Sequence, residues 1–114
     1  MPKKPDAIRL GHMLEVARRA VRHAQSRSRK ELETDELFLH GIVHMLLVLG
    51  EAAARVSDDL RERLPSIPWR EVIGMRNHLI HGYDDVEHET VWRVLTEDLP
   101  PLITELERVL ADLE

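Results

Sequence analysis

The residues best suited to chemistry lie in one short segment, Arg76 to Tyr83, which reads RNHLIHGY. His81 carries an imidazole, which titrates near neutrality and can therefore take up or release a proton. Arg76 carries a guanidinium, which stays protonated and offers a planar fork of donors to a phosphate. The Asn77 amide can bind a phosphate oxygen or orient the histidine. Cleavage of an RNA phosphodiester without a metal needs a base, an acid and a fixed cation, so Arg76, Asn77 and His81 are candidate catalytic residues.

The helical spacing around this segment makes Arg76 unusual. Apolar residues recur as on one buried face of a helix over about residues 69 to 80, and Arg76 falls inside that apolar arc. Asn77 and His81, four residues apart, are neighbours on the polar side. An arginine on an apolar face needs a partner or a wet cleft, because an unpaired buried charge is too unstable. A buried ion pair, for example with Glu51 of the preceding helix, is the structural explanation.

The functional explanation requires Arg76 and His81 to meet, although their five-residue spacing separates them by about 140° on an ideal helix. They converge if the helix unwinds at His81 and Gly82, or if two chains pool their motifs. We favour the second arrangement, since a twofold axis beside this helix would let two arginine-bearing faces enclose a cationic cleft. The sequence therefore predicts a homodimer with a shared site.

The remaining pattern predicts an all-α bundle of four to five helices in a single domain, residues 1–114. The length fits one domain, the commonest residues are good helix formers, and no alternating pattern typical of strands is present. In the central helix, Gly41 and Gly50 are expected to let neighbouring backbones approach closely. The expected segments are a helix at 6–25, a connector at 26–34 with Thr34 or Asp35 as the next N-cap, a central helix from there to about 64, a helix at 69–80 between Pro68 and Gly82, a short helix at 89–99, an interruption at Pro100 and Pro101, and a last helix at 102–113.

Composition and charge narrow the setting of this domain. The chain has no cysteine, which fits a reducing interior, so a cytoplasmic location is expected. The N-terminus has no signal-peptide pattern and the longest apolar run, 45–49, is too short to cross a bilayer, so no membrane contact is expected. The net charge of -5 is unevenly spread, because residues 1–30 carry nine Lys/Arg against two acids. The basic segment 18–30 can gather phosphate, or it can be a solvated helix face.

The stretch from Pro68 to Leu102, PWREVIGMRNHLIHGYDDVEHETVWRVLTEDLPPL, resembles the signature of HepT-like proteins, the toxin half of HEPN/MNT toxin–antitoxin pairs. The resemblance rests on RNxLxHGY, on PWR before it, and on VW and EDLP after it. Weaker similarity continues upstream through TDELFLHGIVHMLLVLGEAAARVS, so about two-thirds of the chain is covered. The first helix matches only in its pattern.

This resemblance implies a dimeric, all-helical domain whose two RNxxxH motifs, here Arg76, Asn77 and His81, face each other across a cleft. It implies an endoribonuclease that acts on cellular RNA with no metal and no cofactor. It also implies a minimal nucleotidyltransferase as antitoxin, in a type VII-like pair, which neutralises the toxin by transferring AMP to Tyr83. Such a group near His81 would repel RNA phosphate. The rival interpretation is a noncatalytic helical adaptor that binds a nucleotidyltransferase or a nucleotide, with Arg76 in a structural ion pair.

Several neighbouring residues have more than one interpretation. The family usually has Arg and Glu in the central helix where this chain has His44 and Leu47, so no polar role is carried over there. His78, beside the motif, either contacts RNA or is solvated. His40 and His44 stand four residues apart but lack a carboxylate between them and a third ligand, so no metal site is expected. The acidic cluster within 84–89 is interpreted as loop solvation or as an antitoxin contact.

Overall fold

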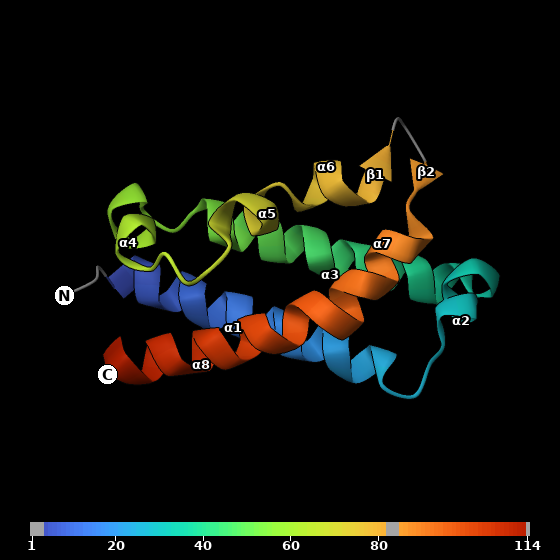
Figure 1. Cartoon of the computed structure of the whole chain (residues 1–114), viewed down its shortest axis with the longest axis horizontal. Coiled ribbons are helices and arrows are strands. Elements are labelled where there is room, and N and C mark those ends of the chain that lie inside the picture. Colours follow the sequence, from blue (N-terminus) through green and yellow to red (C-terminus); the bar gives the residue numbers. More distant parts are fainter. Residues whose placement is uncertain (1–3, 82–84, 114) are drawn as a thin grey trace.

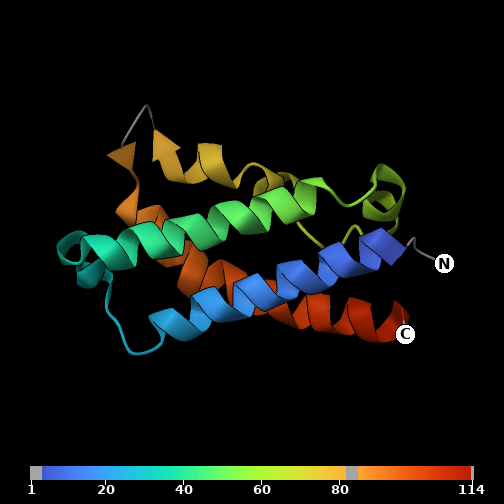
Figure 2. The ribbon, with the colours of Figure 1, turned by 180° about the vertical axis from the view of Figure 1, so that it is seen from behind.

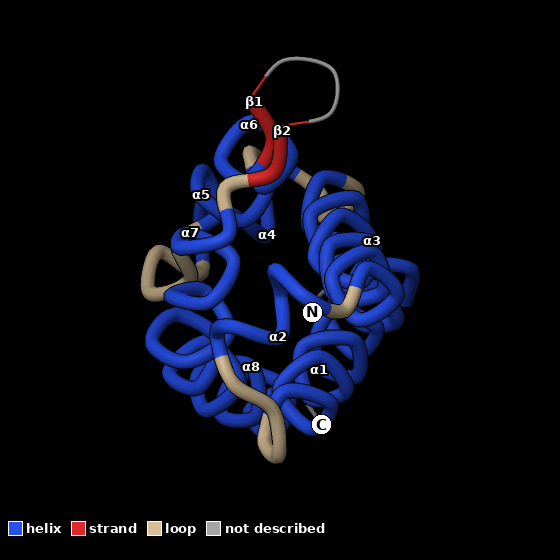
Figure 3. The backbone as a smooth tube through the Cα atoms, turned by 90° about the vertical axis from the view of Figure 1, so that its right-hand side faces the viewer, coloured by secondary structure: helices blue, strands red, loops and turns tan. Residues whose placement is uncertain are grey.

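The computed structural model describes residues 4–81 and 85–113, and it confirms an all-α fold. Four rods pack side by side: α1, α3, the broken pair α5–α6, and the continuous run α7–η1–α8 (Figure 1). Figure 3 looks along these rods and shows them surrounding a common core. The short helices α2 and α4 lie at opposite ends of the bundle (Figure 1). The elements are α1 Lys4–Ala24, α2 Arg29–Thr34, α3 Glu36–Ala54, α4 Asp58–Arg63, α5 Trp69–Ile73, α6 Met75–Leu79, β1 Ile80–His81, β2 Asp85–Val86, α7 His88–Arg93, η1 Val94–Asp98 and α8 Leu99–Leu113.

Large aliphatic side chains from all four rods fill the core. Burying each of them contributes about 1.5–3 kcal/mol of hydrophobic stabilisation. The first helix follows the predicted spacing closely, since its buried residues recur at three- and four-residue steps along the predicted range. The largest fully buried side chains include Leu10 and Met13 from α1, Leu46 and Leu49 from α3, Leu79 from α6, and Leu95, Leu99 and Leu106 from η1 and α8.

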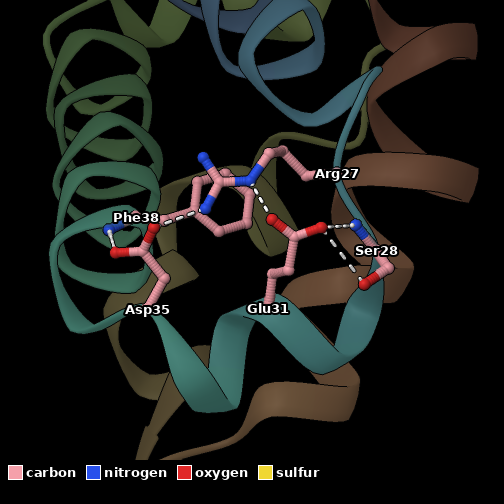
Figure 4. A network of polar contacts seen from close by, with 5 residues as sticks. All are labelled: Arg27, Ser28, Glu31, Asp35 and Phe38. Atoms are coloured by element: carbon pink, nitrogen blue, oxygen red, sulfur yellow. Dashed lines mark hydrogen bonds and ion pairs between the residues drawn. The ribbon is translucent and has the colours of Figure 1, made fainter.

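The corner between α1 and α3 is more ordered than predicted, because residues 29–34 form a helix in place of an irregular connector. Figure 4 shows the network that holds this corner. The Arg27 guanidinium lies 4.1 Å from the centroid of the Phe38 ring and bonds the carboxylates of Glu31 and Asp35, the latter at 2.5 Å. Asp35 also accepts a hydrogen bond from the Phe38 backbone N–H at 3.1 Å, which confirms it as the N-cap of α3. The Ser28 N–H donates to Glu31 at 3.0 Å.

The central helix ends earlier than predicted, at Ala54, and α4 begins as a separate helix. The cause is a polar contact with α1. Asp6 is buried, and its carboxylate accepts hydrogen bonds from the Ser57 N–H at 2.9 Å and the Ser57 hydroxyl at 2.6 Å. The Ser57 side chain in turn accepts from the Leu60 N–H and caps α4. A buried carboxylate thus turns the chain where the apolar pattern alone would continue the helix.

The helix predicted at 69–80 is broken in two at Gly74 and ends at Leu79. Pro68 stands at its start as predicted, as the N-cap of α5. At Gly50, an added Cβ atom would lie 2.9 Å from the Val72 carbonyl oxygen, so α3 and α5 approach as closely as glycine allows. Gly41 differs, since a Cβ there would meet nothing within 4 Å. The predicted close approach is therefore confirmed at Gly50 and wrong at Gly41.

The proline pair does not interrupt the last rod, contrary to prediction. α7 passes through the π-helical turn η1 directly into α8, and Pro100 and Pro101 lie in the first turn of α8. A proline ring clashes with the carbonyl four residues earlier in an α-helix. Here those carbonyls belong to Thr96 and Glu97, inside the wider π turn. We infer that the π turn makes room for both rings and keeps the rod continuous.

The apolar character of α3 follows from its place in the bundle. By length and composition alone, this helix could cross a membrane. In the folded chain it packs against α1 on one side and against α5 and α6 on the other. Of its most apolar 18-residue stretch, 44% is buried. The core helix of a globular bundle has the same composition.

Candidate functional site

The motif residues sit on two different supports. Arg76, Asn77 and His78 belong to α6, whereas His81 belongs to strand β1. The strands pair antiparallel, with Ile80 opposite Val86 and His81 opposite Asp85. This hairpin was not predicted, and it corrects the expectation that Asn77 and His81 are neighbours on one helix. The histidine is positioned by strand pairing, and the arginine by the helix.

Arg76 lies exposed at the seam between α3 and the α5–α6 pair. It lines a hollow of about 210 Å³ together with Leu47, Gly50, Glu51, Ala54 and Ile73. Among the described residues no hydrogen bond or ion pair reaches its guanidinium, and Glu51, also exposed, does not pair with it. The buried ion pair offered as the structural explanation is therefore absent from the described chain. Arg76 meets the other condition, a wet cleft, with its donors free for a phosphate.

His81 has a carboxylate neighbour, Glu87, which the sequence analysis placed in the acidic cluster within 84–89 and not beside the histidine. Its Nε2 atom lies 3.3 Å from Oε1 of Glu87, and the two side chains are 59% and 43% exposed. Glu87 is itself fixed, because its N–H donates to the Leu79 carbonyl at 2.8 Å and it caps the start of α7. The sequence offers one sign of the hairpin that brings Glu87 to His81, which is a run of turn-forming residues between two short apolar stretches. Glu87 thus places a carboxylate against the Nε2 side of the exposed imidazole.

Asn77 and His78 point away from the hollow that contains Arg76. Both are exposed and line a shallow depression of about 320 Å³ with Arg70, Glu71 and Gly74. His78 also borders a cavity of about 400 Å³ between α5–α6 and α8. The Arg108 guanidinium and the Ser66 hydroxyl hold the pKa of one carboxylate there, Glu105, below its usual value.

That cavity is acidic, since Glu71, Asp98 and Glu105 all line it. Carboxylates repel phosphate. On one side His78 therefore borders a cavity that disfavours RNA, and on the other it faces solvent. Its contact with RNA stays a prediction.

The hollow that Arg76 lines does not include His81. Arg76 faces α3, and His81 stands beyond the end of α6 in the hairpin (Figure 1). Tyr83, the predicted acceptor of AMP, lies outside the described residues, as does Gly82. A single chain therefore presents the parts of the motif separately.

The described ranges offer no ready metal centre. Within 4–81 and 85–113, no group of three or more His, Asp or Glu side chains could hold a metal ion. His40 and His44 are both exposed on α3.

An all-α bundle that presents an exposed RNxxxH motif at the junction of a helix and a hairpin belongs to the class of HEPN-type domains. The family model described as "Ribonuclease HepT-like" matches residues 13–109, and the chain belongs to this family. The family supports an RNase of the HEPN type.

Several curated relatives are similar over most of the chain. The "Putative RNase MJ1216" of Methanocaldococcus jannaschii is 32% identical over 114 residues, which is all of this chain and 94% of that protein. The "Putative RNase TTE0752" of Caldanaerobacter subterraneus is 27% identical, across 89% of this chain and 90% of that protein. The "Probable ribonuclease HepT" of Thermococcus cleftensis is 35% identical over 68 residues, 60% of this chain and 62% of that protein. No solved structure matches the chain at a significant level.

Proposed function

We propose that this chain is a metal-independent endoribonuclease that cleaves cellular RNA with Arg76, Asn77 and His81. The observation that carries the proposal is the exposed Arg76, which has no partner among the described residues and lies in the RNxxxH motif of a HepT-like fold. The rival adaptor function requires a structural ion pair at Arg76. That ion pair is absent from the described chain, so the adaptor loses its main support.

The proposed reaction is an internal phosphoryl transfer. One His81 imidazole takes the proton of a 2'-hydroxyl, whose oxygen attacks the adjacent phosphorus. Arg76 stabilises the extra negative charge of the five-coordinate phosphorane through its fork of donors, and Asn77 binds a phosphate oxygen. The bond to the 5'-oxygen breaks, and a protonated imidazole supplies the proton to that leaving oxygen. The products are a 2',3'-cyclic phosphate and a free 5'-hydroxyl.

A homodimer would supply what one chain separates. The lining of the Arg76 hollow is largely apolar and only partly covered, with Leu47 and Ile73 half-buried and Ala54 exposed. Burying such side chains against a second copy is favourable, and a twofold axis there would set two motifs across one cleft. In that arrangement, one histidine can act as base while the other acts as acid.

We further propose that the chain is the toxin of a type VII-like pair. Its antitoxin would be a minimal nucleotidyltransferase that transfers AMP to Tyr83, two residues from His81. The added phosphate would repel the RNA backbone from the site. Mass spectrometry after incubation with that partner and ATP tests this part. Modification that persists in Tyr83→Phe would show that another residue is the acceptor.

An RNA cleavage assay in EDTA tests the central proposal. Wild type should cleave, and Arg76→Ala and His81→Ala should each lose at least about 100-fold in rate, the usual size of an effect on a proton-transfer or charge-stabilising group. Arg63→Ala is the matched control, because it removes the same charge from α4, at the opposite end of the bundle from the hairpin (Figure 1). Circular dichroism checks that all variants are equally folded. Cleavage that is unchanged in both motif variants would refute the enzyme and favour the adaptor.

A further inference from the structure

The seam between α1 and α3 holds one continuous groove. Two hollows, of about 430 and 270 Å³, share Gly41 and Met45 and so join end to end. Figure 2 looks onto this face, where α1 and α3 run side by side. We call the joined hollows the seam groove. Its further lining residues are His23, Arg27, Asp35, Leu37, Phe38 and Ile42 at one end, and His12, Val16, Arg19, His44 and Val48 at the other.

Basic and imidazole side chains line the seam groove. His12, Arg19 and His23 lie on one face of α1, because steps of seven and four residues return to the same side of a helix. His44 faces them from α3. Arg19 has only a 3.9 Å contact with Glu15 in the described chain, and both side chains are about half exposed or more. Such an exposed pair is weak, so the Arg19 guanidinium is available to a phosphate.

Asp35 is the carboxylate among the lining residues described for the groove. Both it and Glu31 bond Arg27, so Arg19 is the arginine there that remains for a ligand. Asp35 bonds Arg27 at 2.5 Å and the Phe38 N–H at 3.1 Å, and these bonds hold the pKa of Asp35 below its usual value (Figure 4). The chain as a whole carries a net charge of -5, and the cavity beside His78 is lined by three carboxylates. Glu105 is paired with Arg108, but Glu71 and Asp98 line that cavity with no Lys or Arg among its described lining residues. An anionic ligand is therefore favoured in the seam groove, which contains Arg19.

The floor of the groove fits unpaired bases. Met45, which is half-buried, provides apolar surface, and the Leu37 side chain at the rim is 85% exposed. Gly41 keeps the middle open, because no atom lies within 4 Å of the position a Cβ would take. A groove with cationic walls and apolar surface for base faces is the arrangement that binds single-stranded nucleic acid.

We propose that the seam groove binds a single-stranded stretch of the RNA substrate, with backbone phosphates at Arg19 and the facing histidines. This inference rests on the proposed function and names a second contact surface for its substrate. α3 alone separates the groove from the hollow of Arg76, so the two sites are one helix diameter, about 10 Å, apart. An RNA strand lying along the groove can cross α3 and reach Arg76. The basic first segment then holds the substrate near the motif.

Fluorescence anisotropy with a labelled 2'-O-methyl RNA tests this binding, because that RNA lacks the attacking hydroxyl and is not cleaved. Arg19→Ala should weaken binding about fivefold at 0.1 M salt, the counterion-release term for one lost phosphate contact on a single strand. The slope of log K against log salt should shrink by about 0.7. Gly41→Leu should weaken binding by blocking the groove without changing charge. The control is Arg18→Ala. It removes the same charge from the residue just before Arg19, whose side chain pairs with Glu107 of α8.

The outcomes separate this inference from the proposed function. If Arg19→Ala and Gly41→Leu bind RNA as Arg18→Ala does, the groove is not an RNA site, even where His81→Ala abolishes cleavage. If the groove variants lose binding but wild type cleaves no RNA, the enzyme proposal fails and the binding surface stands. Gel filtration of every variant completes the test. Lost dimerisation in the groove variants with unchanged RNA binding would make the seam a protein interface and overturn the inference.

Discussion

Replacing Gly50 by alanine should disturb the candidate site, because Gly50 lies directly against α5 and α6. The added Cβ would lie 2.9 Å from the Val72 carbonyl oxygen and 3.4 Å from the Met75 Cβ, so α5 and α6 must shift away from α3. Overpacking of this kind destabilises by about 1–3 kcal/mol. Alanine also favours the helix over glycine by about 1 kcal/mol, which offsets part of the loss. We expect Gly50→Ala to lower the free energy of unfolding by up to about 2 kcal/mol.

Gly41→Ala separates the contact from the helix preference. A Cβ at Gly41 meets nothing within 4 Å, so this variant keeps the gain of about 1 kcal/mol and makes no clash. Urea denaturation should therefore place the two variants about 1–3 kcal/mol apart, the size of the clash alone. RNA cleavage should fall in Gly50→Ala, since α6 carries Arg76. Equal stabilities for the two variants would refute the inferred contact between α3 and α5.

Three further predictions address the hairpin, the buried carboxylate and the α1–α3 corner. Glu87→Ala should lower kcat about 10- to 100-fold with little change in KM, because His81 loses the carboxylate that positions it. Glu87→Gln should retain most of kcat. Equal kcat in Glu87→Ala and wild type would contradict this role. Asp6→Ala should lower the free energy of unfolding by about 2–4 kcal/mol in urea, since it removes two charged hydrogen bonds to Ser57, and a loss below about 0.5 kcal/mol would exclude that role. The bond to Arg27 depresses the pKa of Glu31 in the folded state, and the Phe38 N–H together with Arg27 depresses that of Asp35. Their stabilisation is therefore present above pH 5 and is lost as the pH falls through 4 and below. Thermal unfolding of Arg27→Ala should show a weaker pH dependence over that range, and an unchanged profile would argue against the network.

The sequence predicted the fold class and the first helix well, because both depend on regular spacing of apolar residues. It predicted the cap at Asp35, the helix start at Pro68 and the close approach at Gly50, but it misjudged the chain after Ala54 and at Pro100 and Pro101. The break after Ala54 depends on Asp6, which lies far away in sequence and reaches Ser57 only in the folded chain. The continuous last rod depends on a π turn, which no proline rule anticipates.

At the candidate site, residue types were easier to predict than their placement. The motif gave Arg76, Asn77 and His81 by chemistry and resemblance. The helical wheel then placed Arg76 in a buried arc, because it assumed a straight helix through Gly74, where the chain breaks. Glu87 was recognised only as part of an acidic cluster, because the strand pairing that brings it to His81 leaves no periodic signal in two-residue strands.

The π turn has a consequence for how the chain can change. In a helical rod, one residue more or less rotates everything beyond it by about 100°. The rod reads α7, η1, α8, and the hairpin that carries His81 leads directly into α7. The number of residues in η1 therefore sets the direction of the hairpin relative to α8, which stays packed in the core. Deleting one residue from η1 would rotate the hairpin and point His81 in a different direction, although the sequence of the motif would be unchanged.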